Sequence, residues 1–439
     1  MQRGLQSSQA SNPNNYLNAD VLQSIRSHLL TQTLRSKLDE VVYDYKLPEK
    51  YDLFRTSLRE FLRTEIADTV EYYDKEERFP EENIAKFAAH GYMGIPIPRD
   101  YGGAELGEFG YGLAVQESGK VCSSHGTIIA AHTGLCAIPI LLFGNEYQRK
   151  TYLPDLASGK KMGAFALTEP GAGSDAANIR MTATKSGDHF LLNGTKQFIT
   201  NGDRASTILV FAANDLSLGA FGGITAFIVD RSFGGVKTSK VEKKMGIRAS
   251  TTAQLVFDDC SVPKENILGT FGAGFLVALT ALDGGRASLS AGAVGGAEAA
   301  LEMMLEYLST RPELSSEQSV QWMVADTAIE AHAARQVSYE SLWEIDDYFN
   351  RLALGIRVPR QEREMISRHT AIAKAYCSEV ASRSLEKAMQ IMGNDGYAEG
   401  SGLERGYRDS VIGEIYEGTN DIQRVVIARE LLGLDKTRN

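Results

Sequence analysis

Cysteine is scarce in this sequence. The 439 residues include only four cysteines, Cys122, Cys136, Cys260 and Cys377, which lie far apart and form no Cys-x-x-Cys pair. A disulfide framework or a zinc site needs clustered thiols, with histidines at ligand spacing in many zinc sites. We therefore expect four reduced thiols and no metal site.

Long apolar runs and an excess of positive charge are also missing. Glycines or charges interrupt the apolar stretches before they reach the roughly eighteen residues that a membrane-spanning helix needs, so we expect no membrane insertion. Lys and Arg number 46 against 56 Asp and Glu, which gives a formal net charge of -10. Because such a charge repels phosphate backbones, nucleic acid is not an expected partner.

The N-terminus lacks the features of a cleaved targeting signal. Residues 1–45 contain no apolar segment of the kind found in secretory signals. Three acidic residues, Asp20, Asp39 and Glu40, are unusual for a mitochondrial presequence. We expect residues 1–45 to form an extension that folds onto the rest of the protein. The expected location is the cytoplasm, with the mitochondrial matrix as the alternative.

The spacing of apolar residues predicts helices at both ends of the chain. Phe54, Leu58, Phe61 and Ile66 recur every three to five residues, which is typical of an amphipathic helix. After residue 274 the same helical period returns, and the segment 287–300 is rich in Ala and Gly, which allows close helix packing. The later helices are predicted at 318–346, 367–392 and 421–432.

Between these parts the period changes to two, which predicts strands. Strand-like runs occupy 207–213, 224–229 and 254–257. Asn193-Gly194 and Asn201-Gly202 are expected to form hairpin-type turns, because Asn and Gly tolerate positive φ. No alternation of strands and helices occurs, which argues against a Rossmann domain.

These patterns predict an α+β fold that is mainly α. We expect the extension at 1–45, an N-terminal helical domain at 46–160, a central antiparallel β-domain at 161–273, and a C-terminal four-helix-bundle domain at 274–439.

Two segments of the predicted β-domain suggest a bound cofactor. The run Ala166–Asp175 is rich in Gly and Ser, so its backbone N–H groups could hold a pyrophosphate, although a surface turn is the plain alternative. In the second segment, Phe198 and Thr200 are expected on one face of a strand. An aromatic ring and a hydroxyl donor suit a flavin, whereas an ordinary strand with one core Phe is the alternative.

Five motifs, in this order and spacing, resemble the acyl-CoA dehydrogenase family. They are Phe165–Asp175, Gln197–Gly202, Val262–Asn266, Leu282–Arg286 and Ile415–Asn420. The resemblance is to the short- and medium-chain-like branch and extends over roughly residues 52–432. It implies FAD-dependent α,β-dehydrogenation of an acyl-CoA to the trans-2-enoyl-CoA, with electrons passed to electron-transferring flavoprotein. It also implies a homotetramer built as a dimer of dimers.

The resemblance also assigns roles to residues. Glu417 corresponds to the base that removes the α-proton while N5 of FAD accepts the β-hydride. The positions that correspond to FAD-binding residues are Phe165, Leu167, Thr168, Gly173, Ser174, Phe198, Thr200, Arg311, Gln390, Gly393 and Thr419. The positions that correspond to acyl-CoA-binding residues are Ser174, Asp283, Arg286, Tyr416 and Gly418. Among the FAD positions, Arg311, Gln390 and Gly393 correspond to residues that contact the FAD of a neighbouring subunit.

Glu417 also suits this role on chemical grounds. A thioester α-proton is weakly acidic, so a carboxylate removes it only in a dry site where the enolate oxygen is hydrogen-bonded. Burial beside an acyl chain should raise the pKa of Glu417 towards neutrality. Some family members place the base just before the position of Arg286, but Gly285 stands there. Glu417 is therefore the single candidate base.

The sequence departs from the family pattern in two places. The family's Arg-x-x-Phe-Gly loop is altered and shortened after Arg311, and the segment 351–368 is expected to be an inserted basic loop. The alternatives that keep this fold are a flavoenzyme with other chemistry, namely a monooxygenase, an oxidase or a desulfinase, and a non-enzymatic relative.

Overall fold

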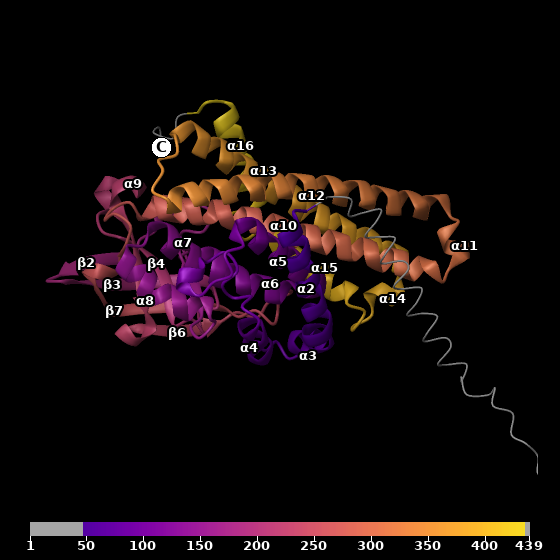
Figure 1. Cartoon of the computed structure of the whole chain (residues 1–439), viewed down its shortest axis with the longest axis horizontal. Helices are drawn as coiled ribbons and strands as arrows, with labels where there is room; N and C mark the ends of the chain where they lie inside the picture. The colour runs from indigo at the N-terminus through magenta and orange to yellow at the C-terminus, as the bar shows by residue number, and fades with distance from the viewer. Residues whose placement is uncertain (1–46, 435–439) are drawn as a thin grey trace, which may run out of the picture.

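The protein is built from a helical part, a sheet and a second helical part in chain order. The computed structural model describes residues 47–434, so the predicted extension at 1–45 lies outside the described residues. Figure 1 shows the sheet at one end of a set of long helices, with the first helices packed across both. The expected α+β, mainly helical fold is confirmed.

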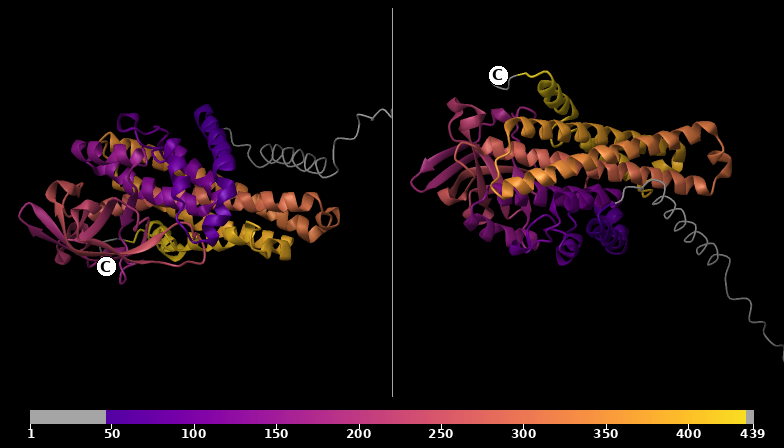
Figure 2. Two further views of the ribbon diagram at one scale, coloured as in Figure 1. Left: turned by 90° about the horizontal axis from the view of Figure 1, so that it is seen from below. Right: turned by 45° about the horizontal axis from the view of Figure 1, so that its top comes forward.

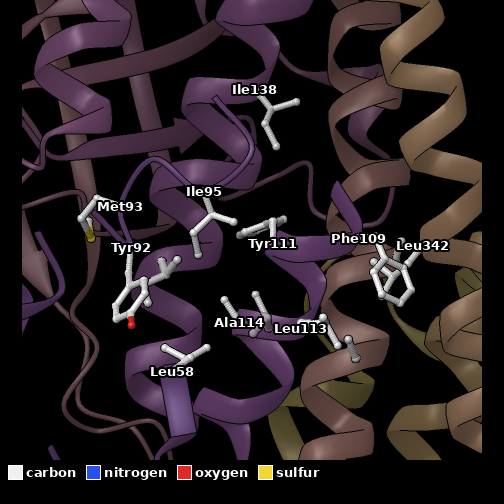
Figure 3. Packing of buried hydrophobic residues seen from close by; sticks show 14 of the residues in the cluster. Leu58, Tyr92, Met93, Ile95, Phe109, Tyr111, Leu113, Ala114, Ile138 and Leu342 are labelled. Atoms are coloured by element: carbon white, nitrogen blue, oxygen red, sulfur yellow. The ribbon is translucent and has the colours of Figure 1, made fainter. Parts of the chain in front are cut away.

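Seven α-helices belong to the first part. They are α2 (Glu49–Phe61), α3 (Val70–Lys75), α4 (Glu81–Ala89), α5 (Gly107–Val121), α6 (Ser123–Ile129), α7 (Ile138–Phe143) and α8 (Glu146–Ala157). In the apolar stripe predicted for the first helix, Leu58, Phe61 and Ile66 are buried, and Phe54 packs against the same core. Figure 3 shows Leu58, Phe109 and Tyr111 in this core with Leu342, which comes from the C-terminal part. The two helical parts therefore share one hydrophobic core.

One segment of this core is long and apolar. By length and composition alone Ser123–Phe143 could cross a membrane, but 78% of its most apolar window is buried inside the fold. Gly, His and Thr residues interrupt this segment, so it contains no unbroken apolar run of the kind that the sequence prediction required. Its burial is what a core helix of a globular fold requires.

The central part is one eight-stranded sheet. Its strands are β1 (Gly163–Ala166), β2 (Thr182–Ser186), β3 (His189–Thr200), β4 (Thr207–Ala213), β5 (Ile224–Asp230), β6 (Val236–Val241), β7 (Thr252–Pro263) and β8 (Ile267–Leu268). The order is β6-β7-β3-β2-β4-β5-β8, with β1 beside β4. Most pairs are antiparallel, as expected, but β1–β4 and β2–β4 are parallel.

The two predicted hairpin turns are wrong. Asn193-Gly194 lies inside β3, where the register against β7 shifts between Leu192 and Gly194. The side chain of Asn193 exchanges hydrogen bonds with Asp259 at 2.9 and 2.8 Å, and Gly194 has φ 150°, so the pair forms a bulge. Asn201 does turn the chain at φ 60°, but the turn connects β3 to β4, which are not neighbours in the sheet.

The C-terminal part contains three long helices and four short ones. They are α10 (Gly274–Ser309), α11 (Pro312–Ser315), α12 (Gln318–Ala353), α13 (Arg360–Met392), α14 (Asn394–Tyr397), α15 (Leu403–Ser410) and α16 (Asn420–Leu431). Figure 2 shows α10, α12 and α13 running side by side away from the sheet. A Cβ on Gly295 would lie 2.1 Å from the carbonyl oxygen of Gln116, so the Ala- and Gly-rich stretch does allow close approach of α10 to α5.

The predicted basic loop at 351–368 is also wrong. Because α12 ends at Ala353 and α13 begins at Arg360, only six residues connect them. Three of the five arginines of this segment pair with acids on the helices: Arg351 contacts Asp347 at 2.9 Å, Arg360 contacts Glu364 at 2.9 Å, and Arg368 pairs with Glu430. Opposite charges four residues apart stabilise a helix, and the prediction of a loop did not take this spacing into account.

Candidate active site

Glu417 lies in a tight turn between α15 and α16. Its φ is 57°, and Gly418 follows at φ 87°, so a non-glycine residue occupies the left-handed region. Such residues carry backbone strain and concentrate at functional sites. Thr419 then begins α16, because its hydroxyl accepts a hydrogen bond from the N–H of Ile422 at 3.2 Å. In this structure the hydroxyl of Thr419 is thus a helix cap.

A buried lysine from α13 holds this turn in place. Lys374 Nζ donates to the carbonyl oxygen of Gly418 at 2.8 Å and to Oδ1 of Asn420 at 2.7 Å. Gln423 Nε2 donates to the carbonyl oxygens of Glu417 and Gly418 at 3.0 and 2.8 Å. The sequence analysis missed Lys374, although a lone Lys within the apolar run Ala371–Ala375 was a usable signal.

The environment of the Glu417 carboxyl favours its protonated form. Burial raises its pKa to about 7, while Arg286 and Lys374 oppose the rise. Oε2 is shielded from solvent and has no hydrogen-bond partner among residues 47–434. Polar atoms buried in this way usually have a partner, so this atom is positioned for something that binds there. The carboxyl is therefore suited to exchange a proton near neutral pH.

Gly285 leaves room for this carboxyl. A Cβ built on Gly285 would lie 2.6 Å from Glu417 Oε2, closer than atoms pack. The glycine belongs to α10, where its own conformation is helical and needs no special freedom. Its missing side chain is thus explained by the position of Glu417.

Gly285→Ala should reduce kcat/KM roughly 100-fold, because the added methyl group pushes the carboxyl from its position by about an ångström. The helix itself should tolerate alanine. Turnover of acyl-CoA measured beside the melting temperature tests this expectation. Native-like turnover in a fully folded variant would show that the carboxyl does not act from this position.

Four of the five predicted substrate residues, all except Ser174, lie in or beside the Glu417 turn. Arg286 Nη1 contacts Asp283 Oδ1 at 2.9 Å, and Ser367 also donates to Asp283 at 2.9 Å. Arg286 Nε lies 3.4 Å from the carbonyl oxygen of Glu417. Burial raises the pKa of Tyr416 to about 12, partly offset by a hydrogen bond with Thr127. The structure thus brings Asp283, Arg286 and Tyr416 to the Glu417 turn.

An elongated cavity opens beside Glu417. It contains about 1120 Å³ of empty space, including its open mouth, and its walls come from α5, α6, α10, α13 and α15. Glu417, Tyr416, Gly285 and Thr200 all line it. Thr200 is the last residue of β3, so the cavity reaches the sheet.

The Gly-rich loop after β1 has a fixed inner side and an open outer side. Lys196 Nζ donates to the carbonyl oxygen of Leu167 at 2.9 Å and to Glu169 Oε1 at 2.8 Å. Burial lowers the pKa of Lys196 to about 8, although Glu169 opposes the shift. At the loop's outer side Ser174 is exposed, and a Cβ on Gly173 would meet nothing within 4 Å. A rigid loop with an open face suits a phosphate ligand, and the sequence analysis missed Lys196 as its support.

Phe198 lies on a bulge instead of a regular strand. Its φ is 57°, and the register against β7 shifts between Lys196 and Ile199, so the alternation expected between Phe198 and Thr200 is interrupted. The side chain of Phe198 is 62% exposed, which is unusual for Phe and leaves a flat apolar surface two residues from Thr200. Exposed aromatic surface of this kind is typical of a binding site for a planar ring.

Two further predicted cofactor residues face the core. Phe165 packs against Phe211 with ring centroids 4.9 Å apart, and Leu167 is buried in the same cluster. Thr168 is half-buried and accepts a hydrogen bond from the N–H of Gln197 at its carbonyl oxygen. Of these three residues, Leu167 is buried, whereas Phe165 and Thr168 are half-buried.

Comparison with known proteins identifies the family. Models of the acyl-CoA dehydrogenase N-terminal, middle and C-terminal domains match residues 48–160, 164–260 and 272–432. The chain belongs to the acyl-CoA dehydrogenase family. Members of this family are oxidoreductases, and the dehydrogenase described here has the three-part fold in full.

Several relatives carry more specific names. The short-chain specific acyl-CoA dehydrogenase of Clostridium acetobutylicum is 40% identical, over 88% of this chain and 99% of that protein. The mitochondrial short-chain specific acyl-CoA dehydrogenase of Sus scrofa is 38% identical, over 90% of this chain and 93% of that protein.

Solved structures extend the comparison. Butyryl-CoA dehydrogenase from Megasphaera elsdenii has a TM-score of 0.83 at 38% identity, covering 89% of this chain and 100% of that one. A chain from a structure of the electron transferring flavoprotein of Acidaminococcus fermentans has a TM-score of 0.83 at 40% identity, covering 89% and 99%. An acyl-CoA dehydrogenase from Bacillus anthracis, complexed with FAD, has a TM-score of 0.80 at 32% identity, covering 88% and 67%.

Three predicted FAD residues lie away from the Glu417 turn of this acyl-CoA dehydrogenase family member. Gly393 is the residue after the end of α13, and Lys374, which contacts the Glu417 turn, lies nineteen residues earlier in that helix. At 1.5 Å per residue, Gly393 and Lys374 are about 28 Å apart. Arg311 lies at the same far end, 3.4 Å from Asp395 and stacked 3.6 Å from the ring centroid of Tyr307. Figure 1 places α11 and α14 at the end of the long helices opposite the sheet. This end, where Gln390 also lies near the end of α13, is far from the Glu417 turn of the same chain.

Proposed function

We propose that this enzyme removes hydrogen from C2 and C3 of an acyl-CoA thioester, with Glu417 as the base. The observation that carries the proposal is the Glu417 carboxyl, which lies over Gly285 in the cavity with its pKa raised to about 7 and no partner for Oε2 among the described residues. A base with a pKa near the working pH combines a usable ionised fraction with a strong drive to take the proton.

FAD is the cofactor of this family of flavoproteins, and the residues of the chain fit it. The open loop at Gly173 and Ser174 would hold its phosphates, and Thr200 and Phe198 would lie beside its ring. When bound, FAD supplies the two-electron oxidant that accepts the β-hydrogen as hydride. The protein groups bind the thioester, exclude water, and take the α-proton at the carboxylate of Glu417, so the product is an enoyl-CoA.

The residues around Glu417 would position the substrate. Arg286 and Asp283 form a buried ion pair on α10 beside the turn. Lys374 and Gln423 hold the carbonyls of Gly418 and Glu417, which fixes the turn, so the backbone N–H of Glu417 keeps one direction and can bond the thioester oxygen. Such a preorganised donor stabilises the negative charge that develops when the proton leaves.

Electron transfer and assembly complete the proposal. A related chain occurs in a structure of an electron transferring flavoprotein, and we assign the same kind of electron acceptor to this enzyme.

The distance of Arg311, Gln390 and Gly393 from Glu417 supports their action on the FAD of a neighbouring subunit, within the homotetramer that the family resemblance implies. The named relatives are bacterial and mitochondrial, and the cytoplasmic location stays a prediction.

The decisive experiment follows the flavin colour without oxygen. The yellow protein is mixed anaerobically with acyl-CoAs, and we expect bleaching whose rate increases as the pH rises through about 7, because the base must first lose its own proton. Rapid turnover should follow when electron-transferring flavoprotein or a dye is added. Flavin that stays oxidised with every thioester would refute the proposal, and vigorous peroxide production in air would instead indicate an oxidase.

A further inference from the structure

The cavity beside Glu417 continues far beyond the reacting carbons. Along α10 it is lined by Gly285, Leu289, Gly292, Gly296 and Met303, which recur at the spacing of one helix face. Gly285 and Met303 are eighteen residues apart, which is five helical turns or about 27 Å. The cavity, which is partly open to solvent, therefore follows one face of α10, and we call this part of it the tunnel.

Small side chains keep this tunnel open. A Cβ on Gly296 would meet only Ala381 Cβ, at 3.9 Å, so this glycine borders empty space. On the opposite wall, Ala381 belongs to a stripe of α13 that also lines the tunnel, with Ser378 and Leu385 at helical spacing. Gly402 borders the far end, where a Cβ would meet Met303 at 3.7 Å.

The cations on the tunnel wall are paired within the protein, and the lining carboxylate of Asp409 accepts a hydrogen bond from the N–H of Ile247. Lys120 contacts Glu298 at 2.9 Å, and Arg405 contacts Glu71 at 3.1 Å and the carbonyl oxygen of Val121 at 3.2 Å. These cations are satisfied by the protein itself, so the remaining lining is mostly small and apolar. An apolar tunnel of this kind favours an alkyl chain over a second charged group.

A butyryl group would leave most of this tunnel empty. An extended alkyl chain advances about 1.3 Å per carbon, given C–C bonds near 1.5 Å. Beyond C3, placed beside Glu417, the space to Gly296 holds about thirteen carbons, and the space to Met303 holds about twenty. Water in the unused length would face apolar walls, which is unfavourable.

We infer that this enzyme, given its proposed function, acts best on unbranched acyl-CoAs of about 14 to 18 carbons, whose ends lie near Gly296 and before Met303, and that the tunnel along α10 binds the chain. This inference differs from what the names of its short-chain specific relatives suggest. The sites of proton removal and of chain-length selection are separate parts of one cavity, since Gly296 lies eleven residues from Gly285.

The test is the ratio of kcat/KM for palmitoyl-CoA to kcat/KM for butyryl-CoA. For butyryl-, octanoyl-, lauroyl- and palmitoyl-CoA, kcat/KM is measured with an electron-accepting dye, below the concentration at which the thioesters form micelles. We expect palmitoyl-CoA to exceed butyryl-CoA by at least tenfold, because each buried methylene improves binding about fourfold until the tunnel ends. A preference for butyryl-CoA would overturn the inference while leaving the proposed function intact. Failure of every thioester to bleach the flavin would instead refute the proposed function.

Gly296→Leu would place a side chain across the tunnel, and we expect the palmitoyl-to-butyryl ratio to fall at least tenfold while lauroyl-CoA is less affected. Gly296→Ala is the graded comparison, since its Cβ makes an ordinary contact and should lower the ratio far less than leucine does. An equal loss for all chain lengths in Gly296→Leu would show that this part of the cavity does not hold the chain, and so would an unchanged ratio in a folded variant.

Discussion

Glu417→Gln should slow flavin reduction by acyl-CoA about 10³-fold or more, because the amide cannot take the α-proton. Glutamine has nearly the shape of protonated glutamate, so the cavity and the strained turn should persist. Rapid mixing without oxygen gives the rate of bleaching directly. Glu414→Gln is the matched control, since this acid lies three residues away in the same segment, and its loss should change the rate little.

The same variant tests the raised pKa independently of catalysis. The pKa of Glu417 is about 7 in the folded protein against an ordinary value of 4.5, so folding binds a proton between these pH values. The stability that comes from this proton is present below pH 4.5 and is lost as the pH rises through 7. At pH 8 the Gln variant should therefore melt at a higher temperature than the native protein, and near pH 5 the difference should shrink. Equal melting temperatures at both pH values, together with native-like bleaching, would exclude Glu417 as the base.

Glu298→Gln should cause the largest loss of stability, roughly 3 to 5 kcal/mol, because it breaks a buried ionic cluster. The fully buried carboxylate of Glu298 contacts Arg335 at 2.6 Å and Lys120 at 2.9 Å, and it accepts hydrogen bonds from Gln116 at 3.2 Å. These contacts join α5, α10 and α12. Without the carboxylate, the buried Arg335 keeps its charge but loses its counterion.

The pH dependence of this loss has the opposite sign to that of Glu417. Burial alone would raise the pKa of Glu298, but Lys120 and Arg335 lower it to about 2 from an ordinary 4.5. Its stabilisation is present above pH 4.5 and is lost as the pH falls towards 2. Melting temperatures of native and variant protein should thus differ by about 3 to 5 °C at pH 7 and converge in acid. Glu302→Gln, which removes the more exposed partner of Lys120, is the control and should shift melting little.

Motif order predicted the family and the fold class correctly, since the five motifs lie in short segments whose chemistry is local. The strands at 207–213 and 224–229 were also predicted well, because both are apolar runs of a buried sheet. Helix lengths were underestimated: α12 and α13 extend towards each other through the segment expected to be a loop, held by ion pairs four residues apart. The predicted domain boundaries stay predictions.

The positions of single site residues were harder to predict. Asn193-Gly194 has the sequence of a turn, yet pairing on both sides of β3 holds it in a strand, as a bulge. Lys374 and Lys196 were missed, because a lysine in a single sequence usually indicates a solvated surface. Both are buried, and each fixes backbone carbonyls of a segment far away in the chain.

By itself the sequence determined which chemical groups the enzyme has: one candidate base at Glu417, a glycine beside Arg286, a Gly-rich loop, and apolar periods that form helices around a sheet. Only the tertiary structure decided how those groups act. The raised pKa of Glu417, the space that Gly285 leaves for its carboxyl, and the tunnel along α10 all arise where segments more than a hundred residues apart come into contact. The burial of the Glu417 carboxyl and its distance from other groups depend on these contacts, so the local pattern of residues along the chain cannot specify them.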